Sequence, residues 1–339
     1  MSESKLQKNA TRRDVAEFAG VSVATVSYVL NNRPGINLRE ETRVRVLEAA
    51  RALKYRPSYV GTALTHRRSF NIGVLFKSLH HLHYHYYREI LIGAGTAMEE
   101  EGYHMLFFFR NFGQQLVESL CSGRADGIFV IQSDSENHQM LELAENHIPM
   151  VSVNYPAPGK SPETTSEVLP DTPGMMHDAI ADFVRNGCRR IALMNKRTPA
   201  NQAMNQAFFS VCEDFSSQGI NGMFVERPAP DELEDCLTEM VRGGQMPEAL
   251  FINRFEYAEA SCRILSRLGI IPGKDILIAA CSPEEAPEFV PYAMTLYLHD
   301  GATIGKIAWE QMKKLLMKNA TPMERRLVPY QKLVVSRKL

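Results

Sequence analysis

One short stretch of the chain concentrates side chains that bind metals or stack on ligands. Residues 80 to 87 hold four histidines and three tyrosines, namely His80, His81, His83, His85, Tyr84, Tyr86 and Tyr87. His81 and His85 have the i, i+4 spacing of a zinc pair on a helix, but no third ligand can be identified elsewhere in the sequence. Three interpretations stay open: a metal site, an exposed loop without a ligand, and an aromatic wall that faces a small molecule. We expect no metal and no cofactor, and histidine protonation would make stacking on such a wall depend on pH.

Motifs of the common enzyme classes are missing from the sequence. It contains no GxGxxG after the first strand-like run, no P-loop lysine motif, no GxSxG and no HExxH. The chain is therefore not expected to be an enzyme.

The composition is that of an ordinary globular chain. Of 339 residues, 45% are hydrophobic and 23% are charged, and no apolar run approaches the ~20 residues that cross a bilayer. The N-terminal segment has no apolar stretch of the signal-peptide type. The six cysteines are scattered without a CxxC pair, which favours reduced thiols. We therefore expect a cytoplasmic protein with no membrane partner.

Charge is distributed unevenly between the two ends of the chain. Residues 1–69 contain 13 lysines and arginines against 6 acids, a net charge of +7, whereas the whole chain has −1. The remaining residues therefore carry a net charge of −8. A small basic module joined to a larger acidic body indicates that the module meets a polyanion.

The basic module has the pattern of two short helices joined by a tight turn. Thr11 and Asp14 form a helix start signal, Gly20 lets the chain reverse, and Ser22 is a natural N-cap for the second helix. The apolar stripes expected to pack inward are Val15, Phe18 and Ala19, then Val26, Val29 and Leu30, and then Val44, Leu47, Ala50 and Leu53 on a third helix over residues 40–53.

The outward face of the second helix then carries small and hydroxyl side chains. These are Ser22, Val23, Ala24, Thr25, Ser27, Tyr28 and Asn31. Such a face suits a helix that enters the major groove of DNA, because hydroxyls and the helix N-terminus hold phosphates while small apolar groups touch thymine methyls.

Three segments of this sequence resemble the lactose/galactose repressor (LacI/GalR) family: "DVAEFAGVSVATVSYVLNN", "EETRVRVLEAARALKYRPS" and "IGVLF". The resemblance is dense over residues 10–64 and looser to the C-terminus. It implies that Val23 and Ala24 read bases. It implies phosphate contacts, or support for them, from Thr11, Ser22, Thr25, Ser27, Asn31, Thr42 and Tyr55.

A hinge helix over residues 58–65 is a further implication of the resemblance. Ser58 would cap it, and Leu64 matches a leucine that enters the minor groove and kinks the DNA. Two positions depart from the family pattern. Tyr28 stands where arginine or histidine is usual, so a different base should be read there. Gly61 stands where alanine is usual, and glycine weakens a helix interior by ~1 kcal/mol relative to alanine.

From residue 71 onward, apolar strand-like runs alternate with helical stretches, which predicts doubly wound parallel sheets. The expected fold class is an N-terminal all-α helix-turn-helix domain followed by an α/β two-lobed core that is periplasmic-binding-protein-like. The expected domains are a tail at 1–9, the helix-turn-helix at 10–56, a hinge and linker at 57–69, and the core at 70–339. The first lobe would hold about 70–160 and 299–325, and the second about 165–298 and 326–339.

In such a core a ligand lies between the lobes, at the carboxyl ends of the strands. The expected effector-binding residues are Tyr84, Tyr86, Tyr87, Arg110, Met204, Asn253, Arg254 and Ser282. Many sugar-responsive relatives carry an arginine at the place of Met204 and an aspartate near Ser282, so an ordinary hexose is a less favoured effector. Lys196 and Arg197 join Arg110 and Arg254 among expected cations near the strand ends. An anionic ligand, a neutral or aromatic ligand, and a site that has lost its ligand all stay open.

The sequence thus predicts a DNA-binding transcriptional regulator, most simply a repressor, that binds a palindromic operator as a homodimer. A small-molecule effector would modulate its affinity for DNA. The family's leucine-heptad tail is missing, which favours a dimer over a tetramer. The alternative from another class is a stand-alone periplasmic-type small-molecule binding protein.

Overall fold

The computed structural model divides the chain into two compact units, Met1–Arg68 and Ser69–Leu339. It describes residues 10–30, 38–56, 61, 63, 66–76, 82, 84–109, 113–131, 138–157, 164–198, 201–282, 290–317 and 324–335. In these ranges, no helix has the length and apolarity that a bilayer span requires.

The first unit is a three-helix bundle around a small apolar core. Its helices are α1 (Arg12–Ala19), α2 (Val23–Leu30) and α3 (Glu40–Ala52). Gly20 has the left-handed φ of 64°, which ends α1 and turns the chain toward α2. The buried residues of the bundle are Val15, Ala16, Ala19, Val26, Val29, Val46, Ala49 and Ala50.

Two of the predicted inward stripes were partly wrong. Phe18 is 65% exposed, and Ala16 takes the inward position on α1. On α3 the buried stripe runs through Val46, Ala49 and Ala50, so that Val44 and Leu47 face solvent at 44% and 37% exposure. Both helices carry apolar residues on more than one side, and the tight crossing of three short helices favours the face with the smaller side chains.

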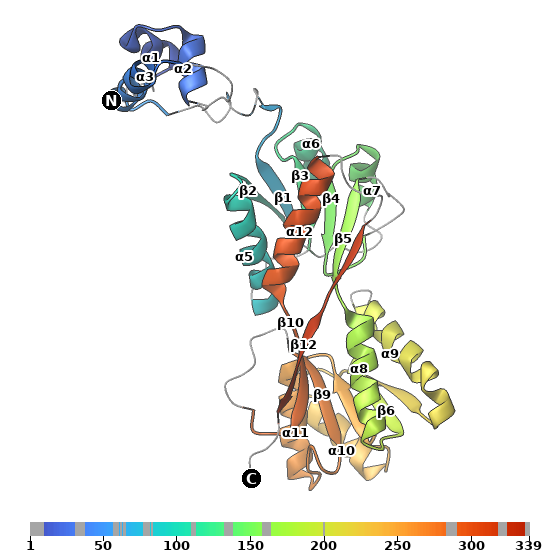
Figure 1. Ribbon diagram of the computed structural model, residues 1–339. Helices are drawn as coiled ribbons and strands as arrows, with labels where there is room; N and C mark the ends of the chain where they lie inside the picture. Colours follow the sequence, from blue (N-terminus) through green and yellow to red (C-terminus); the bar gives the residue numbers. More distant parts are fainter. Residues whose placement is uncertain are drawn as a thin grey trace, which may run out of the picture. The chain divides into compact units, whose positions relative to one another are not determined.

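The second unit consists of two lobes, each with a six-stranded sheet (Figure 1). The first lobe contains β1 (Asn71–Phe76), α5 (His85–Glu99), β2 (His104–Phe109), α6 (Gly113–Cys121), β3 (Gly127–Val130), α7 (His138–Glu145), β4 (Met150–Val153), β5 (Thr165–Pro170), α12 (Gly301–Leu316) and β11 (Arg325–Val328). The second lobe contains α8 (Thr172–Arg185), β6 (Arg190–Asn195), α9 (Gln202–Asp214), η3 (Ser216–Gln218), β7 (Asn221–Glu226), α10 (Leu233–Arg242), β8 (Ala249–Ile252), α11 (Phe255–Arg267), β9 (Leu277–Ser282), β10 (Met294–His299) and β12 (Tyr330–Val335).

Both sheets are wound with helices on both faces, which confirms the predicted fold class. The strand order is β11-β5-β4-β3-β1-β2 in the first lobe and β12-β10-β9-β8-β6-β7 in the second. All pairs are parallel except β10 with β12. Alternation along β1 shows the two faces: Ile72, Val74 and Phe76 pack toward α5 and α12, and Leu75 packs toward α6 and α7.

Helices α5 and α12 approach each other backbone to backbone in the first lobe. A Cβ atom on Gly305 would lie 2.0 Å from the carbonyl oxygen of Ile90, and one on Gly93 would lie 2.0 Å from that of Ala302. Gly301 at the start of α12 faces the backbone of Tyr86 in the same way, at 2.7 Å. Only glycine allows this approach, which joins the start of α5 firmly to the start of α12.

The chain passes between the lobes three times: from β5 to α8, from β10 to α12, and from β11 to β12. The predicted lobe boundaries differ from this arrangement, because they placed residues from about 165 and from 326 in the second lobe. Strand β5 instead pairs with β4 and β11 in the first sheet. The sequence did not predict β5 as a strand of the first lobe because several of its buried residues are polar, among them Glu167. The Glu167 carboxylate accepts hydrogen bonds from Arg325 at 2.5 Å and from the amide of Ala157 at 2.8 Å.

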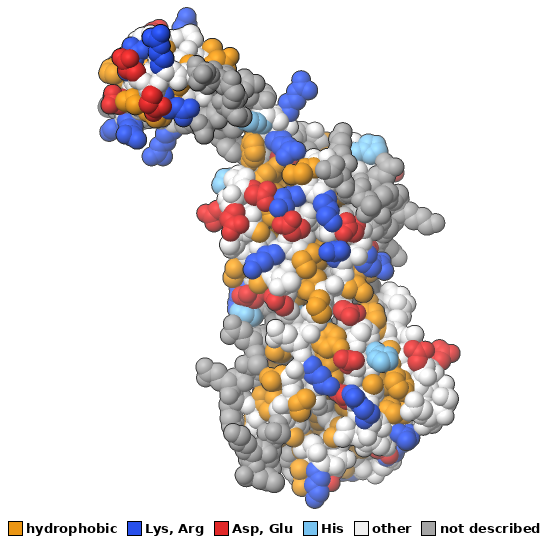
Figure 2. Space-filling view, viewed as in Figure 1, with side chains coloured by type: hydrophobic (Ala, Val, Ile, Leu, Met, Phe, Trp, Pro, Cys, Tyr) orange, Lys and Arg blue, Asp and Glu red, His pale blue; other side chains and the backbone are white. Residues whose placement is uncertain are grey.

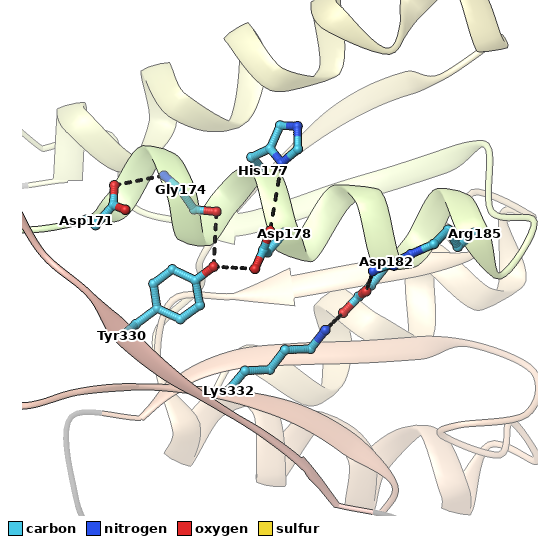
Figure 3. A network of polar contacts seen from close by, with 8 residues as sticks. All are labelled: Asp171, Gly174, His177, Asp178, Asp182, Arg185, Tyr330 and Lys332. Atoms are coloured by element: carbon cyan, nitrogen blue, oxygen red, sulfur yellow. Dashed lines mark hydrogen bonds and ion pairs between the residues drawn. The ribbon is translucent and has the colours of Figure 1, made fainter.

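A polar network holds the last passage against α8 (Figure 3). The Tyr330 hydroxyl donates to the Asp178 carboxylate at 2.5 Å, and Lys332 forms an ion pair with Asp182. At the start of the same helix, Asp171 accepts from the amide of Gly174 at 3.0 Å. The C-terminal strand β12 is therefore tied to the helix that opens the second lobe.

Candidate functional site

The first candidate surface is the start of α2. Val23 is 46% exposed and Ala24 is exposed, while Val26 and Val29 are buried, so the helix presents the predicted small side chains outward. The Ser22 hydroxyl accepts from the amide of Thr25 at 3.1 Å, and the two hydroxyls lie 2.9 Å apart. This cap fixes the first turn and leaves the positive end of the helix exposed.

Thr11 holds the start of α1 by a reciprocal capping box with Asp14. The amide of Thr11 donates to the Asp14 carboxylate at 2.7 Å, and the amide of Asp14 donates back to the Thr11 hydroxyl at 3.3 Å. A hollow beside this helix extends from Arg13 along Gly20 to Val23. Figure 2 shows Lys and Arg side chains over the visible face of this unit.

The other predicted DNA-contacting residues fall in different places. Ser27, Tyr28, Thr42 and Tyr55 are half-buried, and Tyr55 packs against the core of the bundle. Gly61 is helical and half-buried. Asn31, Ser58 and Leu64 lie outside the described residues.

The second candidate region begins with the tyrosines at the start of α5. Tyr86 and Tyr87 are 6% and 8% exposed and belong to the core of the first lobe. The Tyr86 hydroxyl donates to the side-chain oxygen of Asn154 at 2.7 Å, and the hydroxyls of Tyr87 and Tyr155 lie 3.2 Å apart. Burial raises the pKa of both Tyr86 and Tyr87 above the usual value. These two rings therefore form the base of the region rather than an open wall.

Tyr84 differs from its neighbours because it is half-exposed and lies against the other lobe. The guanidinium carbon of Arg254 lies 4.6 Å from the centre of the Tyr84 ring. Arg254 immediately precedes α11 of the second lobe and makes no side-chain cap for that helix. Two residues that the sequence predicted separately are thus brought into one cation–π contact between the lobes.

Four asparagines link the strand ends of the second lobe, and the sequence predicted only Asn253 among them. The side-chain amide of Asn253 donates to the side-chain oxygens of Asn195 at 2.9 Å and Asn201 at 3.3 Å. Asn195 is fully buried and donates to Asn205 at 2.7 Å. The sequence signal that could have revealed them is an asparagine at the end of each of two strands: Asn195 is the last residue of β6, and Asn253 directly follows β8.

Arg227 is a second residue that the sequence did not reveal. It follows β7, its guanidinium carbon lies 4.8 Å from the centre of the Tyr257 ring, and its Nε is buried without a hydrogen-bond partner. Arg197, which was expected among the cations, instead pairs with Glu226 at 3.6 Å. Lys196 is exposed, and Arg110 lies outside the described residues.

The remaining predicted ligand residues are less informative. Met204 is half-buried and packs against the core of the second lobe. Ser282 ends β9, and its side chain lies outside what the structure describes. His80, His81 and His83 lie outside the described residues too. In the described ranges, no three side chains among His, Cys, Asp and Glu are grouped to hold a metal ion.

His299 lies at the end of β10, where the chain leaves the second lobe. Its ring centre is 6.1 Å from that of Tyr86, and its Nδ1 is buried without a hydrogen-bond partner. Burial lowers the pKa of His299 to about 4, although Asp171 acts in the opposite direction. The imidazole is therefore neutral near pH 7.

Two family models match the chain and together cover more than half of it. The model of the bacterial regulatory proteins, lacI family, matches residues 11–58, and that of a periplasmic binding protein-like domain matches residues 180–337. Among curated relatives, the chain is 29% identical over 186 residues to the probable HTH-type transcriptional repressor ExuR of Bacillus subtilis, a match over 54% of each chain. This match spans about half the length of that relative. The chain is 22% identical to catabolite control protein A of Priestia megaterium, over 91% of this chain and 93% of that one.

Solved structures show the same fold. A lac repressor dimer bound to operator and the anti-inducer ONPF matches with a TM-score of 0.77 and 20% identity, over 96% of this chain and 98% of that chain. A complex of the transcriptional regulator CelR with cellobiose matches with a TM-score of 0.65 over the same shares. One model matches the three-helix unit, and the other runs from α8 to β12. The chain thus combines a DNA-binding domain of the lacI-family type with a periplasmic binding protein-like domain, the combination of a DNA-binding transcriptional regulator.

Proposed function

We propose that this chain is a transcriptional repressor that binds a palindromic operator as a homodimer, and that a small molecule between the two lobes changes its affinity for DNA. The observation that carries the proposal is the exposed, rigidly capped start of α2. Its Ser22–Thr25 cap would meet backbone phosphates, and the exposed Val23 and Ala24 would meet base edges in the major groove.

Homodimerisation follows from the size of this surface. Helix α2 has eight residues, so one copy reads a short half-site, and two copies related by a twofold axis read a palindrome. The lac repressor structure with the same fold is a dimer bound to operator. The segment 57–69 would be the hinge that joins each DNA-binding domain at 10–56 to the core at 70–339, with Ser58, Gly61 and Leu64 in the roles that the family resemblance implies.

The response to a ligand would arise from the three passages between the lobes. Tyr84 and Arg254 come from different lobes and are in contact, so a molecule bound beside them touches both lobes at once. A ligand that favours one lobe arrangement shifts the population toward it, and the hinge segments transmit the shift to the DNA. The protein would work in the cytoplasm, where its operator is found.

A salt series on operator DNA tests the DNA-binding part of the proposal. Anisotropy titrations of the full chain with the intergenic DNA upstream of its gene should give log affinity that falls linearly with log salt. The expected slope is about −5 to −9, which corresponds to roughly six to ten phosphate contacts. A flat dependence would favour the stand-alone binding protein.

Two matched valine substitutions locate the DNA-reading face. Val23 on α2 and Val44 on α3 are similarly exposed, at 46% and 44%, so neither change disturbs the core. Val23→Ala should weaken operator binding by about tenfold through the loss of an apolar base contact, and Val44→Ala should bind like the unchanged protein. Equal effects of the two changes would exclude α2 as the reading helix.

A further inference from the structure

Two arginines of the second lobe lie at the ends of β7 and β8, the two strands that flank β6. Arg227 follows β7, and Arg254 lies between β8 and α11. The backbone amide of Arg227 donates to the carbonyl of Asn195 at 2.9 Å, and Asn195 is bonded to Asn253, the residue before Arg254. The buried Asn195 therefore links the backbone at Arg227 to the residue before Arg254.

Neither guanidinium forms an ion pair with a carboxylate in the described parts of the chain. Four other arginines of the same lobe do: Arg185 with Asp182, Arg190 with Glu248, Arg197 with Glu226, and Arg267 with Glu234. Arg227 also keeps its Nε buried and without a hydrogen-bond partner. Buried donors in native proteins are nearly always satisfied, so the arginine is held here at an energetic cost.

The positive charges of Arg227 and Arg254 repel each other. The pKa of Arg227 is lowered first by burial and then by Arg254, and the smaller effects of Tyr257, Tyr84 and Glu256 oppose this without reversing it. Two like charges without an ion-paired carboxylate among the described residues are an unfavourable arrangement that an anion relieves.

The contacts of the two guanidinium groups with aromatic rings do not use their N–H donors. Arg227 lies over Tyr257 and Arg254 over Tyr84, at 4.8 Å and 4.6 Å. A guanidinium that stacks through its face still carries its N–H donors in the plane, in the fork that matches a carboxylate or phosphate. The aromatic rings thus orient the arginines without using their donors.

We infer that Arg227 and Arg254 bind the oxyanion of a negatively charged small molecule, a carboxylate or a phosphate. This inference rests on the proposed ligand site between the lobes and names the chemical class that the site accepts. Because Tyr84 belongs to the first lobe, an anion on Arg254 would bind at the point where the two lobes meet.

Inorganic phosphate and citrate are the probes for this site. The melting temperature of the full chain is followed by calorimetry at low millimolar concentrations of each anion, with ionic strength held constant by sodium chloride. A ligand that binds the native state raises the melting temperature in a saturable way. We expect such a rise with at least one probe, and which probe acts tells a phosphate site from a carboxylate site. No rise with either anion would overturn the inference.

Three substitutions assign the effect to the two arginines. Arg227→Gln and Arg254→Gln should each weaken the anion's apparent affinity by at least about tenfold, because each removes charged hydrogen bonds. Arg197→Gln, in the same lobe but paired with Glu226, should keep the full response. A response that persists in both test variants, or falls equally in Arg197→Gln, would show that the anion binds elsewhere.

Two further measurements keep the outcome interpretable. The melting temperature of each variant without anion reports whether it folds. Arg254→Lys keeps the charge but loses the fork, and should weaken binding less than Arg254→Gln; equal weakening would contradict a role for the charge. These measurements use no DNA, so they are independent of the salt series on operator DNA. A flat salt series would contradict the repressor proposal and leave the anion response intact. Absence of an anion response would contradict this inference and leave operator binding intact.

Discussion

At the scale of single residues, the passage from β10 to α12 places a histidine where water is largely excluded. His299 lies beside the ring of Tyr86, and its Nδ1 has no hydrogen-bond partner. Its pKa is lowered to about 4 by burial, against about 6.5 in an unfolded chain. The unfolded chain therefore binds more protons than the folded one between these two values.

Stability should consequently fall as the pH falls from about 6.5 toward 4. From pH 7.5 to pH 5, His299 should account for about 1–2 kcal/mol of lost unfolding free energy, measured by urea titration at the two pH values. His299→Gln should reduce that loss, whereas His104→Gln, at an exposed position, should not. An equal pH dependence in the His299 variant would place the buried proton-sensitive group elsewhere.

Residue types alone predicted only part of the candidate ligand site between the two lobes. Tyr84 and Arg254 were both predicted near the ligand, and the structure brings them into contact. Arg227 and Asn195 were missed because neither lies in a recognisable motif. Their importance comes from burial and from strand order, which places β7, β6 and β8 side by side, and a single sequence does not specify that arrangement.

At the scale of elements, the glycine contact between α5 and α12 gives the first lobe its rigidity. Gly305→Ala would place a methyl group 2.0 Å from the carbonyl oxygen of Ile90, and both helices would have to separate. The expected loss is about 1–3 kcal/mol or more of unfolding free energy, measured by urea titration. Gly95→Ala is the matched control, because its nearest neighbour is the Met105 side chain at 3.5 Å. It should stabilise α5 by up to ~1 kcal/mol, and a similar loss in both variants would contradict the close approach.

The alternation of strands and helices in the core was predictable, because buried parallel strands form apolar runs such as β3 and β8, whose residues are all buried. The lobe assignment of β5 was not predictable, since its buried residues Thr165, Ser166 and Glu167 are polar. On α1 and α3 the sequence did not specify which apolar residues face inward, because each helix has more apolar side chains than the core can bury. Tertiary packing decides which of them are buried.

At the scale of the whole molecule, the two units have separate cores and opposite net charges. The Asp126 carboxylate ties down the start of the second unit: it accepts from the amide and hydroxyl of Ser69 at 2.7 and 2.9 Å and from the amide of Phe70 at 3.0 Å. A chain that begins at Ser69 should therefore retain a cooperative calorimetric transition at the temperature of the core in the full chain. A chain that begins at Ile72 lacks these three hydrogen bonds and should melt lower. Failure of the longer fragment to unfold cooperatively would mean that the core needs the first unit.

In the asparagine network of the second lobe, one backbone carbonyl decides which side-chain groups donate hydrogen bonds and which accept them. The side-chain amide of Asn205 donates to the backbone carbonyl of Lys196 at 3.2 Å, and a carbonyl can only accept. Asn205 must then offer its oxygen to Asn195, and Asn195 must offer its oxygen to Asn253. Both hydrogen bonds of Asn253 within the network therefore use its side-chain amide as the donor. A ligand group that meets the side-chain oxygen of Asn253 must therefore be a hydroxyl or N–H donor, and the backbone carbonyl of Lys196 sets this requirement through the network.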